Sequence, residues 1–306
     1  MKAVTATGPA GRTAELTDVA EPEPKPHEAL VEVAAFSPNL GEAFLLEQPR
    51  PGWRPGKDIA GTVTRQAADG TGPRLGQRVA GHPDQAGWAE RVAVPTDRLV
   101  VVPDTIDLAV AATLPLAGLT ALRLLRLAGP AASRRVLVTG ASGGVGHYFT
   151  ELAAAQGALV TAVSATAQRG KRLLALGAAE VVTAVEDSTG PFDVGIDSVG
   201  GSSTPAVWHK LTQHGTLIWC GQASRTPPQL DFFDWEGATS GTIRRFHYLE
   251  SDVSVAADLA TLIRLVATGR LHPEIGSAEP WDNIAAVIDA LTARRIRGNA
   301  VLTIAP

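Results

Sequence analysis

Short apolar runs separated by proline and glycine fill the first part of the chain, up to about residue 118. Runs of this kind, rich in Val and Ala and bounded by turn residues, are typical of β-strands. They predict strands at residues 29–36, 59–65, 76–81 and 88–95. Their spacing predicts a compact, mainly β domain with hairpins.

Residues 107–129 show a different pattern, which is rich in Ala and Leu. Asp107 stands where a helix N-cap is expected, because its carboxylate can accept hydrogen bonds from the first helical turn. Pro115 lies inside the run and lacks a backbone N–H, so it must interrupt the helix. The pattern predicts a helical segment with a break near Pro115.

From Arg135 onward, strand-like runs alternate with helical runs. The predicted strands are residues 135–140, 158–164, 180–184, 192–198 and 215–221, and the predicted helices are residues 146–157 and 169–177. Parallel strands need crossover helices between them, so the alternation predicts a doubly wound parallel sheet. Two amphipathic helices, at 254–269 and 281–298, and a strand at 300–304 complete the chain.

The segment "LVTGASGGVG", residues 137–146, joins the first of these strands to its helix. Glycines at 140, 143 and 146 allow a tight turn and let a ligand approach the backbone. The N–H groups that open the helix then face an anion such as a dinucleotide pyrophosphate. Ser142, Gly143, Gly144, Val145 and Gly146 are the expected contacts. The alternative is a tight turn that needs glycine only for packing.

The end of the second strand bears on the choice of cofactor. NAD usually meets a carboxylate there, about 20 residues beyond the glycine loop. This chain has no Asp or Glu at that place and instead offers Ser164, Thr166 and Arg169. Hydroxyl and guanidinium groups suit a 2′-phosphate, which predicts NADPH rather than NADH. The alternative is that Arg169, Lys171 and Arg172 only form the solvated face of the next helix.

Composition narrows the class of protein. Hydrophobic residues make up 45% and charged residues 19% of the 306 residues, which is typical of a soluble globular protein. The net charge of −4, without a basic run, argues against nucleic acid as a partner. No apolar stretch is long enough for a membrane span or a signal core. The single cysteine, Cys220, fits a cytoplasmic setting.

Two oxidoreductase families share the glycine segment. Short-chain dehydrogenases also use a Tyr-x-x-x-Lys pair, but Tyr148 and Tyr248 are followed four residues later by Leu152 and Asp252. The chain instead resembles the medium-chain dehydrogenase/reductase superfamily, in its zinc-independent quinone oxidoreductase and enoyl reductase branch. The motifs that carry the resemblance are "ALVEVAAFSPNLGE", "PGKDIAG", "LGQRVAG", "ASGGVG" and "RGNAVLTI".

This resemblance implies an α/β protein of two domains. A GroES-like, mainly β domain would comprise residues 1–118 and 251–306, and a Rossmann NADPH-binding domain residues 119–250. Arg169 falls where the branch has a phosphate-binding lysine, and a homodimer is expected by analogy. Further expected cofactor contacts are Asn39, Thr120, Ser198, Val199, Gly221, Gln222 and Asn299, the last at a place where lysine is usual.

Zinc-dependent relatives have metal ligands at motif positions that are occupied by other residue types in this chain. The segment for a cysteine ligand reads Ser37-Pro38-Asn39, and the His-Glu position reads Lys57-Asp58. Catalytic zinc needs three protein ligands, and the one cysteine and scattered histidines do not supply them. The sequence therefore predicts no metal.

Without a metal, hydride transfer favours a small-molecule acceptor that delocalises negative charge, such as an enone, an enoyl thioester or a quinone. Asn39 and Tyr248 are the candidate catalytic residues. Phe44 occupies the place of the branch's usual tyrosine, so the proton comes from Tyr248, from solvent or from the substrate. Aromatic residues that could line an apolar cleft between the domains are Phe36, Phe44, Trp53, Phe232, Phe233 and Trp235.

Two other functions stay open at this stage. One is an NADPH-dependent ketone reductase or another tailoring enzyme on the same scaffold. The other is a non-catalytic NADPH-binding sensor or scaffold, because the catalytic residues match the branch poorly. The Ala-, Pro- and Arg-rich composition suggests a high-GC bacterium, in which such enzymes often serve secondary metabolism.

Overall fold

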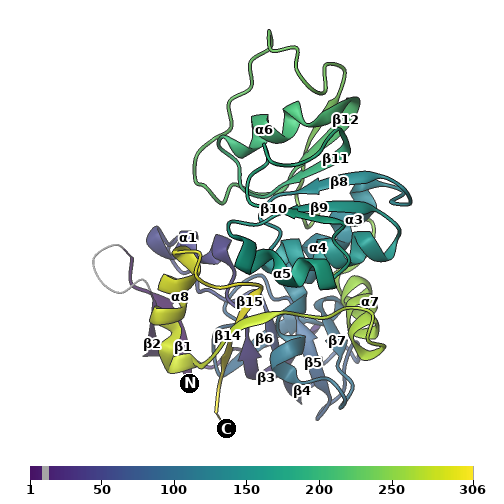
Figure 1. Ribbon diagram of the computed structural model, residues 1–306. Helices are drawn as coiled ribbons and strands as arrows, with labels where there is room; N and C mark the ends of the chain where they lie inside the picture. The colour runs from purple at the N-terminus through teal and green to yellow at the C-terminus, as the bar shows by residue number, and fades with distance from the viewer. Residues whose placement is uncertain (9–13, 306) are drawn as a thin grey trace. The chain divides into compact units, whose positions relative to one another are not determined.

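The computed structural model describes residues 1–8 and 14–305 and divides into two compact units (Figure 1). Unit 1 comprises Met1–Leu119 and Asp252–Pro306, and unit 2 comprises Thr120–Ser251. Both combine helices with sheets. None of the described helices has the length and hydrophobicity that a membrane span requires.

Unit 1 is built mainly from strands. β1 (Lys2–Ala6) and β2 (Ala14–Asp18) form an antiparallel pair. A larger sheet has the order β14-β15-β3-β4-β5-β7, with β6 paired to β3. Its strands are β3 (Glu28–Phe36), β4 (Ile59–Arg65), β5 (Arg78–Gly81), β6 (Arg91–Pro95), β7 (Leu99–Val101), β14 (Ile275–Pro280) and β15 (Asn299–Thr303). All four strands predicted in this region exist, although β5 and β6 begin two and three residues later than predicted.

The helices of unit 1 begin at polar caps. Asp107 accepts a hydrogen bond from Ala109 N (2.7 Å) at the start of α2, and Ser254 accepts one from Ala257 N (3.2 Å) at the start of α7. Pro115 interrupts the helical segment as predicted, and a π-helical turn spans Leu114–Gly118. The helices are α1 (Leu40–Glu47), α2 (Leu108–Ala111), α7 (Val255–Ala267) and α8 (Ile284–Thr292).

The core of unit 1 contains a pair of fully buried aromatic rings. Phe36 and Trp88 stack with ring centroids 5.7 Å apart. Phe36 is therefore a core residue and does not line a cleft. The backbone beside Trp88 lies so close to Gly56 that a Cβ on Gly56 would be 2.1 Å from Trp88 N. This approach fixes the segment that leads into β4.

Unit 2 holds a six-stranded, wholly parallel sheet in the order β10-β9-β8-β11-β12-β13. This is the predicted doubly wound sheet, and the α/β fold class is confirmed. The strand order reverses between β8 and β11, and ligands bind at such a switch point, beyond the carboxyl ends of the strands. The strands are β8 (Arg135–Val138), β9 (Leu159–Val163), β10 (Glu180–Val182), β11 (Phe192–Asp197), β12 (Leu211–Trp219) and β13 (Thr242–Arg245).

Helices connect β8 to β9, β9 to β10 and β11 to β12 as crossovers. α4 (Gly144–Ala155) and α5 (Ala167–Ala175) contact β9, and α6 (Ser203–His209) contacts β11 and β12. α3 (Leu119–Ala128) precedes β8. Gly157 and Gly177 follow α4 and α5 with φ values of +86° and +95°, which is the left-handed conformation that ends a helix.

Replacing Gly56 by alanine tests the close approach to Trp88. Gly56→Ala should lower the free energy of unfolding by more than about 4 kcal/mol, because backbone atoms cannot make room for the new Cβ. Gly52→Ala is the matched control, since Gly52 also has a positive φ (+74°) but its Cβ would meet nothing within 4 Å. It should cost about 1 kcal/mol. Urea denaturation measures both, and equal losses would contradict the steric account.

Candidate functional site

The glycine segment of unit 2 lies between the end of β8 and the start of α4. Gly140 has a φ of +62°, and a Cβ there would lie 2.5 Å from Ser198 Oγ. A Cβ on Gly146 would lie 2.5 Å from both Ala141 Cα and Gly140 O. These two glycines are required for packing, as the alternative interpretation of the segment supposes.

Gly143 is different, because packing does not explain it. Gly140 O, at 3.3 Å, is the one described atom within 4 Å of where its Cβ would be. Gly143 caps α4, and Gly143, Gly144 and Val145 are half-exposed. The first N–H groups of a helix have no partner inside it. The segment therefore presents uncovered backbone donors with space in front of them, which suits a phosphate group.

His147 supports this segment without adding charge to it. Its ring is buried, and Nδ1 lies 3.0 Å from Gly143 O. Burial lowers the pKa of His147 to about 4, so the ring is neutral at pH 7. A neutral Nδ1–H donates to the Gly143 carbonyl and fixes the loop.

Arg169 brings a permanent positive charge to the glycine segment. It lies in the first turn of α5, where its backbone N donates to the capping hydroxyl of Thr166 (3.2 Å). Its side-chain Nε donates to Ser142 Oγ (3.4 Å). Ser164 is fully buried, and its hydroxyl donates to Thr166 O (3.3 Å). Ser142, Thr166 and Arg169 thus lie together, as an additional phosphate site requires, while Ser164 supports the turn.

Asp197, at the end of β11, organises the turn at the carboxyl end of that strand. The sequence analysis assigned no role to it. Its buried carboxylate accepts five hydrogen bonds, from Thr139 Oγ1, Val199 N, Gly200 N, Ser203 Oγ and Thr204 Oγ1, at 2.6–3.2 Å. An acidic residue that ends an apolar strand and is followed by glycine and hydroxyl residues was the available signal. Asp197 fixes the backbone on which Ser198 and Val199 lie.

The predicted contacts after β11 and β12 lie side by side. Ser198 O accepts from Ala223 N (3.1 Å), and Val199 O accepts from Ser224 N (2.8 Å). A Cβ on Gly221 would be 2.8 Å from Ser198 O, so Gly221 is needed for this approach. Gln222 follows directly. Ser198 Oγ donates to Thr139 O (3.0 Å), which ties this pair of turns to the glycine segment.

Two further predicted residues of unit 2 are Thr120 and Tyr248. The buried Thr120 Oγ1 has no hydrogen-bond partner within the part of the chain that the structure describes. An unsatisfied buried hydroxyl is costly, so it is a candidate for contact with a ligand. Tyr248 is half-buried, and its backbone carbonyl accepts from Arg123 Nη1 (2.6 Å).

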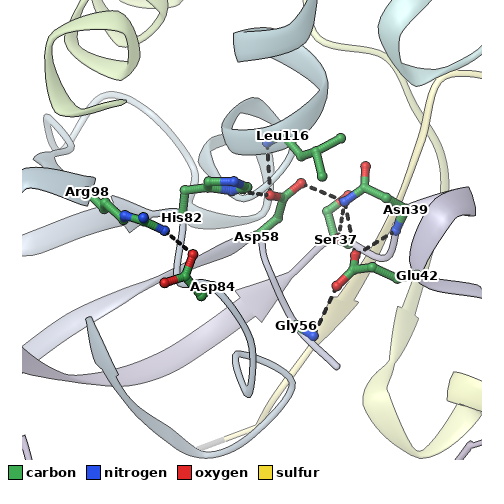
Figure 2. Close-up of polar contacts among 9 residues, drawn as sticks. All are labelled: Ser37, Asn39, Glu42, Gly56, Asp58, His82, Asp84, Arg98 and Leu116. Carbon is green, nitrogen blue, oxygen red and sulfur yellow. Dashed lines mark hydrogen bonds and ion pairs between the residues drawn. The ribbon is translucent and has the colours of Figure 1, made fainter. Parts of the chain in front are cut away.

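A network of polar side chains lies in unit 1 around Asn39 (Figure 2). Asn39 Nδ2 donates to Asp58 Oδ2 (2.9 Å) and to Glu42 Oε2 (3.2 Å). The second oxygen of Asp58 accepts from Leu116 N (2.8 Å) and contacts His82 Nδ1 (3.2 Å). We call Asn39, Glu42, Asp58 and His82 the Asn39 network. Of its members, the sequence analysis assigned a role only to Asn39.

Glu42 carries the perturbed carboxyl group of the Asn39 network. It is buried, and its Oε1 accepts from Gly56 N (3.0 Å). Burial, and secondly the nearby Asp58 carboxylate, raise the pKa of Glu42 to about 7, although hydrogen bonds from Asn39 and Gly56 oppose the rise. Glu42 therefore exchanges its proton near neutral pH.

The remaining predicted residues lie elsewhere. Asn299 begins β15 in unit 1, where its buried Nδ2 contacts Glu274 O (3.4 Å). Phe232 of unit 2 contacts Phe233 and Trp235 edge to face, and the three side chains are 65–79% exposed. They form a surface cluster on the chain between β12 and β13.

Potential metal ligands come together at one place among the residues described. His209, Asp234 and Glu236 of unit 2 have ligand atoms within 4.8 Å of one another. His209 Nε2 already pairs with Asp234 Oδ2 at 2.6 Å, and both side chains are partly exposed. This geometry is that of a surface ion pair. Asp58, at the position where zinc-dependent relatives are expected to have a ligand, accepts hydrogen bonds from Asn39 Nδ2 and Leu116 N.

Comparisons with known proteins find similarity to dehydrogenases, quinone oxidoreductases and reductases. A family model described as zinc-binding dehydrogenase matches residues 176–302. Quinone oxidoreductase of Pongo abelii is 27% identical over 286 residues, which are 88% of this chain and 86% of that protein. 2-Methylene-furan-3-one reductase of Solanum lycopersicum is 31% identical over 237 residues, 71% of this chain and 60% of that protein. The solved structure of mycobacterial Rv1454c with NADPH has a TM-score of 0.89 and 25% identity, and covers 99% of this chain and 100% of that one.

The raised pKa of Glu42 makes stability depend on pH. The group has a pKa of 4.5 in its ordinary state and about 7 when folded, so the folded chain binds the extra proton between these values. Its contribution to stability is complete below pH 4.5 and is lost as the pH rises through 7. The shift corresponds to about 3 kcal/mol.

Urea denaturation at a series of pH values measures this effect as the difference between the wild type and Glu42→Gln. We expect the difference in unfolding free energy to fall by about 3 kcal/mol between pH 4.5 and 7.5. Glu15→Gln, at an exposed position of β2, is the control and should give a flat difference curve. A flat curve for Glu42→Gln would contradict the assignment.

Proposed function

This chain belongs to the medium-chain dehydrogenase/reductase superfamily, in its quinone oxidoreductase-like branch, and from that membership we propose that it uses NADPH to reduce an activated C=C bond or a quinone without zinc. Enzymes of this branch are oxidoreductases, and so is this chain. The observation that carries the choice of cofactor is Arg169, whose guanidinium lies beside Ser142 of the glycine segment.

The cofactor is NADPH, and the residues of unit 2 fit it. The N–H groups of Gly144 and Val145, at the half-exposed start of α4, suit a pyrophosphate, and a side chain on Gly143 would occupy the space beside them. Arg169 suits the 2′-phosphate that distinguishes NADPH from NADH. No acidic residue lies between Ser164 and Arg172 to repel that phosphate. Further proposed contacts are Asn39, Thr120, Ser142, Gly146, Ser164, Thr166, Ser198, Val199, Gly221, Gln222 and Asn299.

The proposed substrate is a small molecule that delocalises negative charge when it accepts hydride. Bound NADPH supplies that hydride. Two of the similar proteins are named for such substrates, a quinone and a methylene-furanone, which is an enone. The chain's own groups would orient the reactants, with Asn39 in unit 1 and the phenol of Tyr248 in unit 2 as candidates for polar contact. Zinc independence is supported by the segment Ser37-Pro38-Asn39 and the pair Lys57-Asp58, which stand where zinc-dependent relatives are expected to have ligands.

We further propose a homodimer in the cytoplasm. β13 is the last strand of its sheet, and all four of its residues are exposed. No described strand pairs with its outer edge, so a second copy can satisfy the backbone groups there by strand pairing. The single cysteine fits a reducing compartment.

Arg169→Ala tests the choice of cofactor. The substitution removes a charged contact to the 2′-phosphate, so KM for NADPH should rise about 10- to 100-fold while KM for NADH changes little. Lys171→Ala, an exposed residue of the same helix, is the matched control and should leave both values unchanged. Steady-state kinetics with each cofactor measure the ratio. An equal rise for NADPH and NADH would contradict the role of Arg169.

A panel of acceptors tests the reaction. NADPH oxidation should proceed with quinones, enones and 2-enoyl thioesters and should be much slower with simple ketones. The product of an enone should be the saturated ketone, which mass spectrometry identifies. Turnover of ketones to alcohols would instead make the chain a ketone reductase. NADPH binding without turnover of any acceptor would contradict an enzymatic role.

A further inference from the structure

The Asn39 amide in unit 1 is held in one orientation. Its Nδ2 faces three oxygens: Ser37 O at 3.3 Å, Glu42 Oε2 at 3.2 Å and Asp58 Oδ2 at 2.9 Å. A flipped amide would point its own oxygen at two carboxyl groups, which is repulsive. The assignment of nitrogen and oxygen is therefore forced by the surroundings. Figure 2 shows Oδ1 pointing away from both carboxyl groups.

Asp58 cannot turn away to release this constraint. It is fully buried at the start of β4, and Oδ1 accepts from Leu116 N (2.8 Å) and contacts His82 Nδ1 (3.2 Å). The backbone N–H of Leu116 can only donate, so the atom of residue 58 that faces it must be an acceptor, here Oδ1. The other oxygen, Oδ2, is then left to face Asn39.

Glu42 fixes the same amide from the opposite side. Its Oε2 accepts from both the backbone N and the side-chain Nδ2 of Asn39, each at 3.2 Å. Its Oε1 accepts from Gly56 N (3.0 Å), and the Gly56 segment is itself held against Trp88. Two carboxyl groups from separate segments thus converge on one amide nitrogen.

We propose that Asp58 and Glu42 are positioning residues that keep the Asn39 nitrogen turned inward and present Oδ1 as a hydrogen-bond acceptor for a ligand. This role rests on the proposed function, since the ligand is the cofactor or the substrate. The group that binds Oδ1 must be a donor, such as a carboxamide N–H or a hydroxyl. Asn39 then orients that donor and cannot itself donate to a developing enolate. The donor to the enolate is another group.

Protonation of Glu42 weakens this arrangement, because a carboxylic acid has fewer acceptor sites than a carboxylate. The Asp58 carboxylate acts on Glu42 across the Asn39 amide nitrogen, which contacts both carboxyl groups, and His82 contacts the far oxygen of Asp58. Since the pKa of Glu42 is about 7, the environment of the Asn39 amide should change around neutral pH.

The composition of the chain permits a direct measurement. It has only three asparagines, Asn39, Asn283 and Asn299, so the full chain labelled with [15N]asparagine gives three side-chain NH2 pairs in NMR. Loss of one pair in Asn39→Gln assigns Asn39. The measurement needs no ligand. It therefore reports on the amide alone, while NADPH turnover by the wild type reports on the proposed function alone.

In the wild type, we expect the Asn39 NH2 pair to exchange with water at least tenfold more slowly than the pair of the exposed Asn283. Its shifts should titrate with a midpoint near pH 7, and Glu42→Gln should abolish that titration. Asp84→Asn is the matched control, because Asp84 pairs with Arg98 nearby but does not touch Asn39, and it should change nothing. Exchange as fast as that of Asn283 would overturn the proposal.

Asp58→Asn tests the functional half. Leu116 N keeps the new amide oxygen, so the new NH2 faces Asn39 and reverses its preferred orientation. We expect loss of the slow exchange and a fall of about tenfold in kcat/KM for NADPH oxidation. If Asp58→Asn does not fold, Glu42→Gln provides the test. The pH profile of its kcat/KM for NADPH oxidation is then compared with that of the wild type around pH 7. The role of Oδ1 would be overturned if the wild type oxidises NADPH and Asp58→Asn loses the slow exchange but keeps the wild-type kcat/KM.

Discussion

The close approach of Gly146 to the backbone at Gly140 and Ala141 decides how α4 leaves β8, and the proposed cofactor site depends on it. With the helix held against the turn, its first N–H groups face outward at the reversal of strand order in unit 2. Gly143 then keeps the space in front of them open. One backbone constraint therefore creates both the donors and the access that an anionic ligand needs.

Buried carboxyl groups organise the local structure of each unit by accepting hydrogen bonds from several segments. Asp197 joins the turns after β8 and β11, and Asp58 joins segments around Asn39, His82 and Leu116. A buried charge is costly unless donors surround it, so each carboxylate strongly selects one local arrangement. Each carboxylate thereby positions a residue that we propose as a ligand contact, Val199 in unit 2 and Asn39 in unit 1. Glu42 adds sensitivity to pH, because its pKa lies near neutrality.

Sequence reasoning succeeded where the signal is local. The parallel sheet, the Asp107 cap and the break at Pro115 follow from periodicity and capping, and each was confirmed. It failed for short elements such as α1 and α6, and it extended the last helix to residue 298 although α8 ends at Thr292. The Asn39 network could not be predicted, because Asn39, Asp58 and His82 meet only through the fold. The pattern of apolar and polar residues does not predict contacts between residues that are far apart in the sequence.

The central claim is that unit 2 grips a dinucleotide diphosphate at the glycine segment and a second phosphate at Arg169. Calorimetric titration of the unmodified chain with NADPH, repeated with NADH, tests it most directly. The account predicts one NADPH bound per chain, at least about tenfold more tightly than NADH. Absence of binding by either nucleotide would contradict it.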